Sequence, residues 1–157
     1  MTRTCAPLET PIGLMWVLRS SAGLVAVLRG EIPPADARLD PEACASTIRE
    51  LEAYFRGDAK SFAVELDLSG ASRFDADVYA AARTIPYGAT VSYGELAIMA
   101  GRPGAARAVG GAMARCPIAP VVPCHRVIHA DGGIGGWGSE LWVKRWLLDM
   151  ERRHATA

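Results

Sequence analysis

The amino-acid sequence predicts a mixed α/β fold of the α+β kind, in which a small sheet-plus-helix lobe precedes a mainly helical one. Short apolar runs that suit β-strands are confined to residues 1–70, where one stretch of helical periodicity interrupts them. After the break "SGAS" at residues 69–72, helix-like segments separated by glycine turns replace the strands. We therefore expect an α/β lobe over residues 1–70 and a second domain over residues 71–157.

The first lobe should contain a hairpin, a helix and a third strand. The stretch "PIGLMWVLRSSAGLVAVLRG" at residues 11–30 holds two apolar runs separated by serine, alanine and glycine, which is typical of a β-hairpin. A loop rich in proline and charge should occupy residues 33–40. Helical spacing of apolar residues predicts a helix over residues 41–56, with Gly57 as its stop. The segment "FAVELDL" at residues 62–68 predicts the third strand.

The second half begins with two predicted helices. Residues 74–82 have helical spacing, and the turn "IPYG" follows them. Ser92, with Glu95 three residues later, forms a capping box that begins a helix running through Ala100. Gly101 then ends this helix.

Pro103 is placed to open the next helix near its first turn, and "GAARAVGGAMA" continues that helix to about residue 114. With the preceding helix it predicts a helix-turn-helix unit. One face is a core stripe of Ala105, Val109, Ala112 and Met113, and the opposite face carries Arg107, Gly110, Gly111 and Ala114. Two glycines in mid-helix indicate close approach of another surface, either the rest of the protein or a DNA groove that Arg107 enters. The face has no Asn or Gln to read bases, so binding to DNA would be largely independent of sequence.

Composition excludes several classes of function. Lys and Arg total 17, as do Asp and Glu, so no global positive field holds nucleic acid. The four cysteines show no CxxC spacing and the histidines are few, which argues against a zinc site and favours thiols in a reducing compartment. No apolar stretch approaches the roughly 20 residues of a membrane span, and the first residues lack the apolar run of a signal peptide, so we expect a cytoplasmic protein.

A candidate nucleophile lies in "VPCHRVI" at residues 122–128. A thiol attacks only as the thiolate, so Cys124 needs a base, and His125 is the nearest one. On an extended strand His125 would reach Cys124 only through a water molecule or a bend, and it could equally be a buried structural histidine. Glu151 shares a helical face with Leu147 and Leu148, and we predict that it contacts His125. The alternative for Glu151 is a capping role or a surface pair with the arginines that follow it.

The segment "DGGIGGWG" at residues 131–138 is suited to a binding loop, with Trp137 as an aromatic wall. Trp142 and Trp146 lie four residues apart on the last predicted helix, where core packing is the simplest interpretation.

These motifs together carry a family resemblance. "PCHRV", preceded by "ARAVGGAM" and followed by a glycine-rich loop and "KRWLLDME", closely resembles the O6-alkylguanine-DNA alkyltransferases. The match is dense from residue 85 to residue 151, and "TPIG" at residues 10–13 resembles the start of the family. The resemblance implies an RNase H-like N-terminal lobe and a winged helix-turn-helix-like unit in the second domain.

The resemblance implies a DNA repair protein that binds duplex DNA through the minor groove and flips out an O6-alkylated guanine. It would move the alkyl group irreversibly to its own cysteine, in a single turnover, with no cofactor and no metal. The protein would act as a monomer, with cooperative binding on DNA as an open possibility.

The resemblance also implies roles for single residues. Cys124 would be the alkyl acceptor, His125 its water-linked base and Glu151 the carboxylate that orients the histidine. Tyr93 would assist rotation of the nucleotide and donate to the leaving guanine, and Arg107 would fill the gap left by the flipped base. Further residues would face DNA: Ser92, Ala106, Gly110, Gly111, Ala114 and Arg115. The pocket would be lined by Met113, Val127, Trp137, Gly138, Ser139 and Lys144.

Two departures from the family pattern stand out. Cys116-Pro117 occupies the place of a usual Asn-Pro, and a thiol is a weaker donor and acceptor than an amide. Phe74-Asp75 stands where Phe-Gln is usual. Two other functions remain: a relative that binds alkylated DNA without repairing it, and a cysteine hydrolase or redox enzyme that uses the same Cys-His pair.

Overall fold

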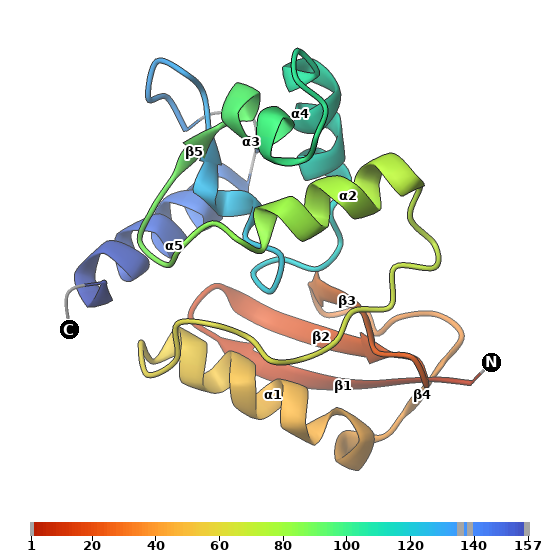
Figure 1. Cartoon of the computed structure of the whole chain (residues 1–157). Helices are drawn as coiled ribbons and strands as arrows, with labels where there is room; N and C mark the ends of the chain where they lie inside the picture. The colour runs from red at the N-terminus through yellow and green to blue at the C-terminus, as the bar shows by residue number, and fades with distance from the viewer. Residues whose placement is uncertain (1, 135–136, 138–139, 156–157) are drawn as a thin grey trace. The chain divides into compact units, whose positions relative to one another are not determined.

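The computed structural model describes residues 2–134, 137 and 140–155. It divides into two compact units, one over residues 1–70 and the other over residues 71–157 (Figure 1). Within the described residues, no helix is both long enough and apolar enough to span a membrane.

Unit 1 is a four-stranded sheet with one helix on a face. The strand order is β3-β2-β1-β4, with β1 antiparallel to β2, β2 antiparallel to β3, and β1 parallel to β4. The bounds are β1 Arg3–Thr10, β2 Gly13–Arg19, β3 Leu24–Arg29, β4 Ala37–Leu39 and α1 Pro41–Phe55. Helix α1 lies along the sheet (Figure 1) and contacts β1 and β2. Val17, Leu51 and Tyr54 are fully buried and form part of this core.

The predicted hairpin and the predicted helix are confirmed in unit 1. The hairpin is β2 and β3, and α1 begins after Asp40, whose carboxylate accepts a hydrogen bond from the amide of Ala43 at 3.1 Å. Strand β4 lies inside residues 33–40, where the sequence predicted only a loop, and β1 was not predicted.

The predicted strand over residues 62–68 is wrong. Only Leu66 bridges the sheet, through Leu24 at the edge of β3. The amide of Leu24 donates to the carbonyl of Glu65, and the amide of Asp67 donates to the carbonyl of Leu24. Phe62 instead packs against Tyr54, with 5.2 Å between the centres of the two rings. The segment therefore meets the sheet at one residue and forms no strand ladder with it.

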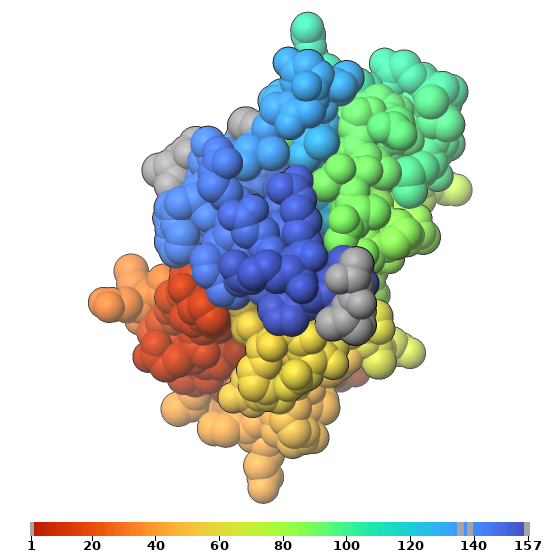
Figure 2. Space-filling model, turned by 90° about the vertical axis from the view of Figure 1, so that its left-hand side faces the viewer, coloured from red at the N-terminus to blue at the C-terminus, as the bar shows by residue number. Residues whose placement is uncertain are grey.

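Unit 2 is mainly helical. Its elements are α2 Arg73–Ala82, β5 Val91–Ser92, α3 Tyr93–Met99, α4 Ala106–Arg115, the 3-10 turn η1 Cys124–Arg126, β6 Val127–Ile128 and α5 Leu141–His154. The short strands β5 and β6 pair in parallel, and α3 packs against α4. Helix α5, dark blue in Figure 2, lies at the surface of this unit, with one side exposed and the other buried.

The predicted capping box is confirmed at the start of α3. The hydroxyl of Ser92 accepts from the amide of Glu95 at 3.0 Å, and the carboxylate of Glu95 accepts from the amide of Ser92 at 2.9 Å. The prediction that Pro103 opens the next helix is wrong. Gly104 follows it with φ of +84°, a left-handed conformation that no α-helix contains, so α4 begins only at Ala106.

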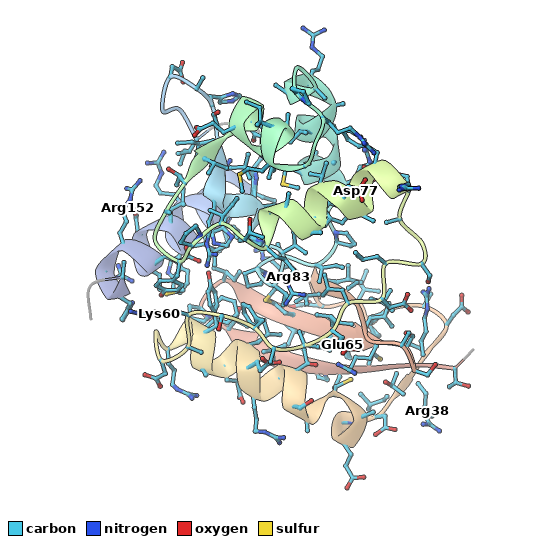
Figure 3. All side chains as sticks on the ribbon, viewed as in Figure 1. Arg38, Lys60, Glu65, Asp77, Arg83 and Arg152 are labelled. Atoms are coloured by element: carbon cyan, nitrogen blue, oxygen red, sulfur yellow. The ribbon has the colours of Figure 1, made fainter. Side chains whose placement is uncertain are left out.

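An ion pair connects the turn between α3 and α4 with α2. Asp77 of α2, labelled in Figure 3, accepts a hydrogen bond from the Arg102 guanidinium at 3.1 Å. The same guanidinium lies 5.8 Å from the centre of the Phe74 ring. Both groups of the ion pair are partly exposed, so the contact sets the position of the turn more than it stabilises the fold.

Candidate active site

Cys124 lies in the one-turn 3-10 helix η1, so the extended conformation considered for "PCHRV" is wrong at this point. The amide of Cys124 donates to the carbonyl of Val122 at 2.8 Å, and the amide of Arg126 donates to that of Pro123 at 2.9 Å. Three residues per turn place successive side chains about 120° apart. Cys124 and His125 therefore do not point to opposite faces, and both are buried.

A buried carboxylate joins η1 to α5. Glu151 Oε2 lies 2.6 Å from His125 Nε2, so the contact predicted between these residues is confirmed. The Arg126 guanidinium donates to both oxygens of Glu151, at 2.8 and 2.9 Å, and to the carbonyl of Ile85 at 2.7 Å. The side chains of His125 and Glu151 are 0% and 1% exposed, which removes this network from solvent screening.

The charges of this network fix the tautomer of the histidine. Burial alone would raise the pKa of Glu151, but hydrogen bonds from His125 and Arg126 hold that pKa far below its usual range. Burial lowers the pKa of His125 and keeps the ring neutral. Because an ionised carboxylate only accepts hydrogen bonds, Nε2 carries the hydrogen, and Nδ1 is the ring nitrogen that can take up a proton.

Lys144 brings a buried ammonium to the site. Its Nζ donates to the carbonyl of Val127 at 2.7 Å and lies 5.8 Å from the ring centre of Tyr93 and 5.7 Å from that of Trp137. Burial lowers the pKa of Lys144 to about 8. Its positive charge in turn acts to lower the pKa of the Cys124 thiol. This attraction opposes the effect of burial, which favours the uncharged thiol and leaves the pKa of Cys124 well above its usual value.

A second thiol adjoins Cys124. Cys116 forms the C-cap of α4 and is half-buried. Interaction with Cys116 and burial raise the pKa of the Cys124 thiol, whereas interaction with Cys124 lowers the pKa of Cys116. Among the described residues, no group of three or more His, Cys, Asp or Glu side chains is placed to hold a metal ion.

The outer face of α4 is open. Arg107 and Ala114 are exposed, and Gly110 and Gly111 are half-buried. A Cβ built on Gly110 would lie 3.9 Å from the Tyr93 ring, which is ordinary van der Waals contact. A Cβ on Gly111 would approach only the flexible guanidinium of Arg115, at 3.0 Å. Packing within the chain therefore does not require two glycines here, which favours close approach of an outside surface.

Residues 73–153 match a family model described as "6-O-methylguanine DNA methyltransferase, DNA binding domain". A methylated-DNA–protein-cysteine methyltransferase of Mycolicibacterium paratuberculosis is 53% identical over 118 residues, which cover 75% of this chain and 71% of that protein. The chain belongs to the 6-O-methylguanine DNA methyltransferase family. The resemblance inferred from "PCHRV" and its surroundings is thereby confirmed.

Solved structures support this methyltransferase assignment. The crystal structure of Mycobacterium tuberculosis OGT in complex with DNA has a TM-score of 0.88 and 41% identity, over 96% of this chain and 94% of that chain. The mixed α/β fold expected from the sequence is confirmed by this likeness. A DNA base-flipping protein of Thermus thermophilus is also 40% identical over 149 residues, which are 92% of this chain and 97% of that protein.

The structure brings most of the expected methyltransferase site together. Residues from η1, β6, α3, α5 and the loop before α5 are joined by the contacts described above: Cys124, His125, Val127, Tyr93, Lys144, Glu151 and Trp137. Met113 is buried on the inner side of α4. Gly138 and Ser139 lie outside the described residues.

Several other residues that the sequence analysis singled out make contacts, or have a burial, that it did not predict. The hydroxyl of Ser92 caps α3, and Ala106 is half-buried in the first turn of α4. Arg115, expected to face DNA, donates two hydrogen bonds to the carboxylate of Asp75, at 2.8 and 3.2 Å. Core packing of Trp142 was a wrong prediction, because this residue is 50% exposed. Trp146 is half-buried.

Sequence reasoning missed Arg126 and Tyr79. Arg126 is 6% exposed and holds Glu151. Tyr79 is 2% exposed and donates from its hydroxyl to the carbonyl of Ala112 at 3.0 Å. The sequence did contain a signal for Arg126. A charged side chain between apolar residues needs a partner if it is buried, and Glu151, on an apolar stripe, has the opposite charge.

Proposed function

We propose that this chain repairs DNA by moving the alkyl group of O6-alkylguanine irreversibly to Cys124, after the damaged base has rotated out of the duplex. The observation that carries the proposal is a buried cysteine beside the Lys144 ammonium and the His125–Glu151 pair, within the region matched by the methyltransferase family model. Because a thioether is not reduced back to a thiol, each molecule would act once.

The chemistry requires a soft nucleophile and a proton for the leaving group. The thiolate of Cys124 attacks the alkyl carbon, a C–S bond forms, and the bond from that carbon to guanine O6 breaks. Nδ1 of His125 would take the thiol proton through a water molecule, with Glu151 and Arg126 holding the ring. The guanine leaves as an anion and is protonated, with Tyr93 as the proposed donor.

Tyr93 is suited to donate a hydrogen bond to the departing guanine. Burial and the negative charge at Cys124 raise its pKa, so its hydroxyl keeps its hydrogen at neutral pH. Its ring also lies beside Lys144 Nζ, at 5.8 Å. The ammonium offsets negative charge as the reaction moves it from sulfur to guanine.

DNA would bind through the helix-turn-helix unit of α3 and α4, which we propose to be of the winged type and to enter the minor groove. The open glycine face of α4 supports close approach, and the exposed Arg107 supports filling of the gap left by the flipped base. Ser92, Ala106, Ala114 and Arg115 would contact the backbone near this helix. Contacts of this kind carry little base sequence information.

Further parts of the proposal concern the whole molecule. We propose that residues 1–70 form an RNase H-like domain and residues 71–157 the DNA-binding and alkyl-acceptor domain. The protein would work as a monomer in the cytoplasm. Support comes from the two compact units and from the likeness to the mycobacterial structure, which contains DNA.

Intact mass measurement tests the alkyl transfer. The protein is mixed with duplex DNA that contains O6-methylguanine, and the expected result is a gain of one methylene unit, located by peptide mapping at Cys124. Cys124→Ser should abolish the gain, and Cys44→Ala, which alters a buried cysteine of unit 1, should retain it.

Two other outcomes would overturn the proposed transfer. Tight binding of the damaged duplex with an unchanged mass would instead favour a lesion-binding protein, a function for which the base-flipping relative of Thermus thermophilus gives a precedent by name. Turnover of an ester or peptide would favour a cysteine hydrolase.

A further inference from the structure

We propose that Asp75 is a positioning residue, which holds the guanidinium of Arg115 on the open face of α4 for contact with a DNA phosphate. The inference rests on the proposed binding of DNA through α4. It deepens that function by naming the group that orients one of the backbone contacts. Asp75 lies on α2, outside the helix-turn-helix unit of α3 and α4.

The contact between Arg115 and Asp75 is bidentate. Nη2 of Arg115 donates to Oδ1 of Asp75 at 2.8 Å, and Nε donates to Oδ2 at 3.2 Å. Paired hydrogen bonds of this kind fix the plane of a guanidinium as well as its place. A guanidinium carries five N–H groups, so this pairing leaves one N–H on Nη2 and both on Nη1 for another acceptor.

The rest of the guanidinium lies on the outer face of α4. Residues four apart share one row of a helix surface, and Arg107, Gly111 and Arg115 form such a row. A Cβ built on Gly111 would lie 3.0 Å from Nη1 of Arg115. The side chain of Arg115 is 60% exposed and that of Asp75 only 12%. The carboxylate therefore occupies the edge of the guanidinium that faces α2, and Nη1 lies beside Gly111 on the face proposed to meet DNA.

The position of Asp75 is set by α2. Its amide donates to the hydroxyl of Ser72, the N-cap of this helix, at 3.0 Å. Helix α2 lies beside α4 (Figure 1), and the buried hydroxyl of Tyr79 donates to the carbonyl of Ala112 in α4 at 3.0 Å. A carboxylate held in this way can set the direction of a long side chain on the neighbouring helix.

Orientation and charge act in opposite directions at Asp75. A long arginine side chain loses rotamer freedom when it binds a phosphate, and a side chain that is already ordered loses less on binding. The negative charge of Asp75, in contrast, repels DNA. If the carboxylate only held α2 against α4, its removal in a folded variant would strengthen binding to DNA. If it positions Arg115, its removal should weaken binding.

The test measures binding of the full chain to an undamaged fluorescent duplex by anisotropy, at several salt concentrations. The proteins compared are wild type, Asp75→Asn, Arg115→Gln and the double variant. Asp149→Ala removes an exposed carboxylate of α5 and is the control for net charge. Circular dichroism and urea unfolding establish that each variant is folded.

Asp75→Asn should weaken binding ~3- to 10-fold, because one of the two acceptor oxygens becomes an NH2 group and the guanidinium is no longer ordered. Arg115→Gln should also weaken binding, and it should lower the slope of log K against log salt by ~0.9, the value of one phosphate contact. In the double variant, the loss of Asp75 should cause no further weakening. Asp149→Ala should not weaken binding. If Asp75→Asn does not fold, Asp75→Gln, which is also neutral, replaces it.

Four results would overturn the proposal: unchanged or tighter binding by folded Asp75→Asn, an unchanged salt slope in Arg115→Gln, an equal effect of Asp75→Asn with and without Arg115, or an equal loss in Asp149→Ala. Failure of the wild type to bind the duplex would overturn it as well.

The methyl-transfer mass assay separates this inference from the proposed function. Coupling of Asp75 with Arg115 in DNA binding, together with no gain of mass at Cys124, would reject alkyl transfer and retain the role of Asp75. Normal transfer without coupling would reject only the role of Asp75.

Discussion

Replacement of Glu151 by glutamine should destabilise the protein strongly. The carboxylate accepts hydrogen bonds from His125 at 2.6 Å and from Arg126 at 2.8 and 2.9 Å, and all three groups are buried. Glutamine keeps the volume but leaves the Arg126 guanidinium without its counter-charge. Removal of one partner of a buried ion pair costs about 3–5 kcal/mol. This is a large part of the roughly 5–15 kcal/mol that separates folded from unfolded domains.

Urea unfolding measures this cost directly. We expect a lower midpoint at an unchanged slope, because the surface exposed on unfolding is the same. The control is the double variant Arg126→Met/Glu151→Gln, which removes both charges and should lose less than the sum of the single variants, with a coupling of about 1 kcal/mol or more. A loss below about 1 kcal/mol in Glu151→Gln would refute the argument that this buried carboxylate is required by its partners.

The same variant should change how stability depends on pH. The pKa of Glu151 is lowered in the folded state, so its stabilisation is complete above the unfolded value of about 4.3 and is lost as pH falls through the folded value. The lowered pKa of His125 acts in the same direction, because the unfolded ring takes up a proton near pH 6.5 before the folded ring does. Wild-type stability should therefore fall with acidification, and Glu151→Gln should show a weaker fall below about pH 4.3.

Three further variants test other parts of the site. Arg107→Ala should reduce transfer from duplex DNA far more than reaction with free O6-benzylguanine, and equal losses in the two mass assays would mean a structural role for this arginine. Gly110→Ala should raise the free energy of unfolding by about 0.5–1 kcal/mol, because glycine is a poor helix former, while weakening binding to a fluorescent duplex; unchanged affinity would contradict the close approach of DNA to this face. Lys144→Met should shift the rate profile of Cys124 alkylation by iodoacetamide to higher pH, since the ammonium favours the thiolate, and an unshifted profile would argue against that electrostatic role.

Local chemistry in the sequence predicts the elements whose stabilising groups are close along the chain. The capping box of Ser92 and Glu95 is a contact over three residues, so it could be inferred without the rest of the fold. The hairpin is similarly defined by two runs and the turn between them. Pro103 shows the limit of such reasoning, because the left-handed conformation of Gly104 moves the helix start beyond it.

Which segments pair with the edges of the sheet could be learned only from the tertiary structure. Residues 62–68 have the composition of a strand, but only Leu66 meets the edge of β3. Whether a β-rich segment pairs depends on an available sheet edge, which is a long-range property. For the same reason the parallel pairing of β4 with β1 could not be inferred from the residues of β4.

The sequence by itself predicted the family, the contact between His125 and Glu151, and Cys124 as the candidate nucleophile, because these depend on residue chemistry and on spacing along the chain. Only the tertiary structure decided that Arg126 and Lys144 are buried. Sequence rules place charged side chains at the surface, since burial of a charge is costly without a partner. The partners here come from segments many residues away, and only the folded chain brings them within hydrogen-bonding distance.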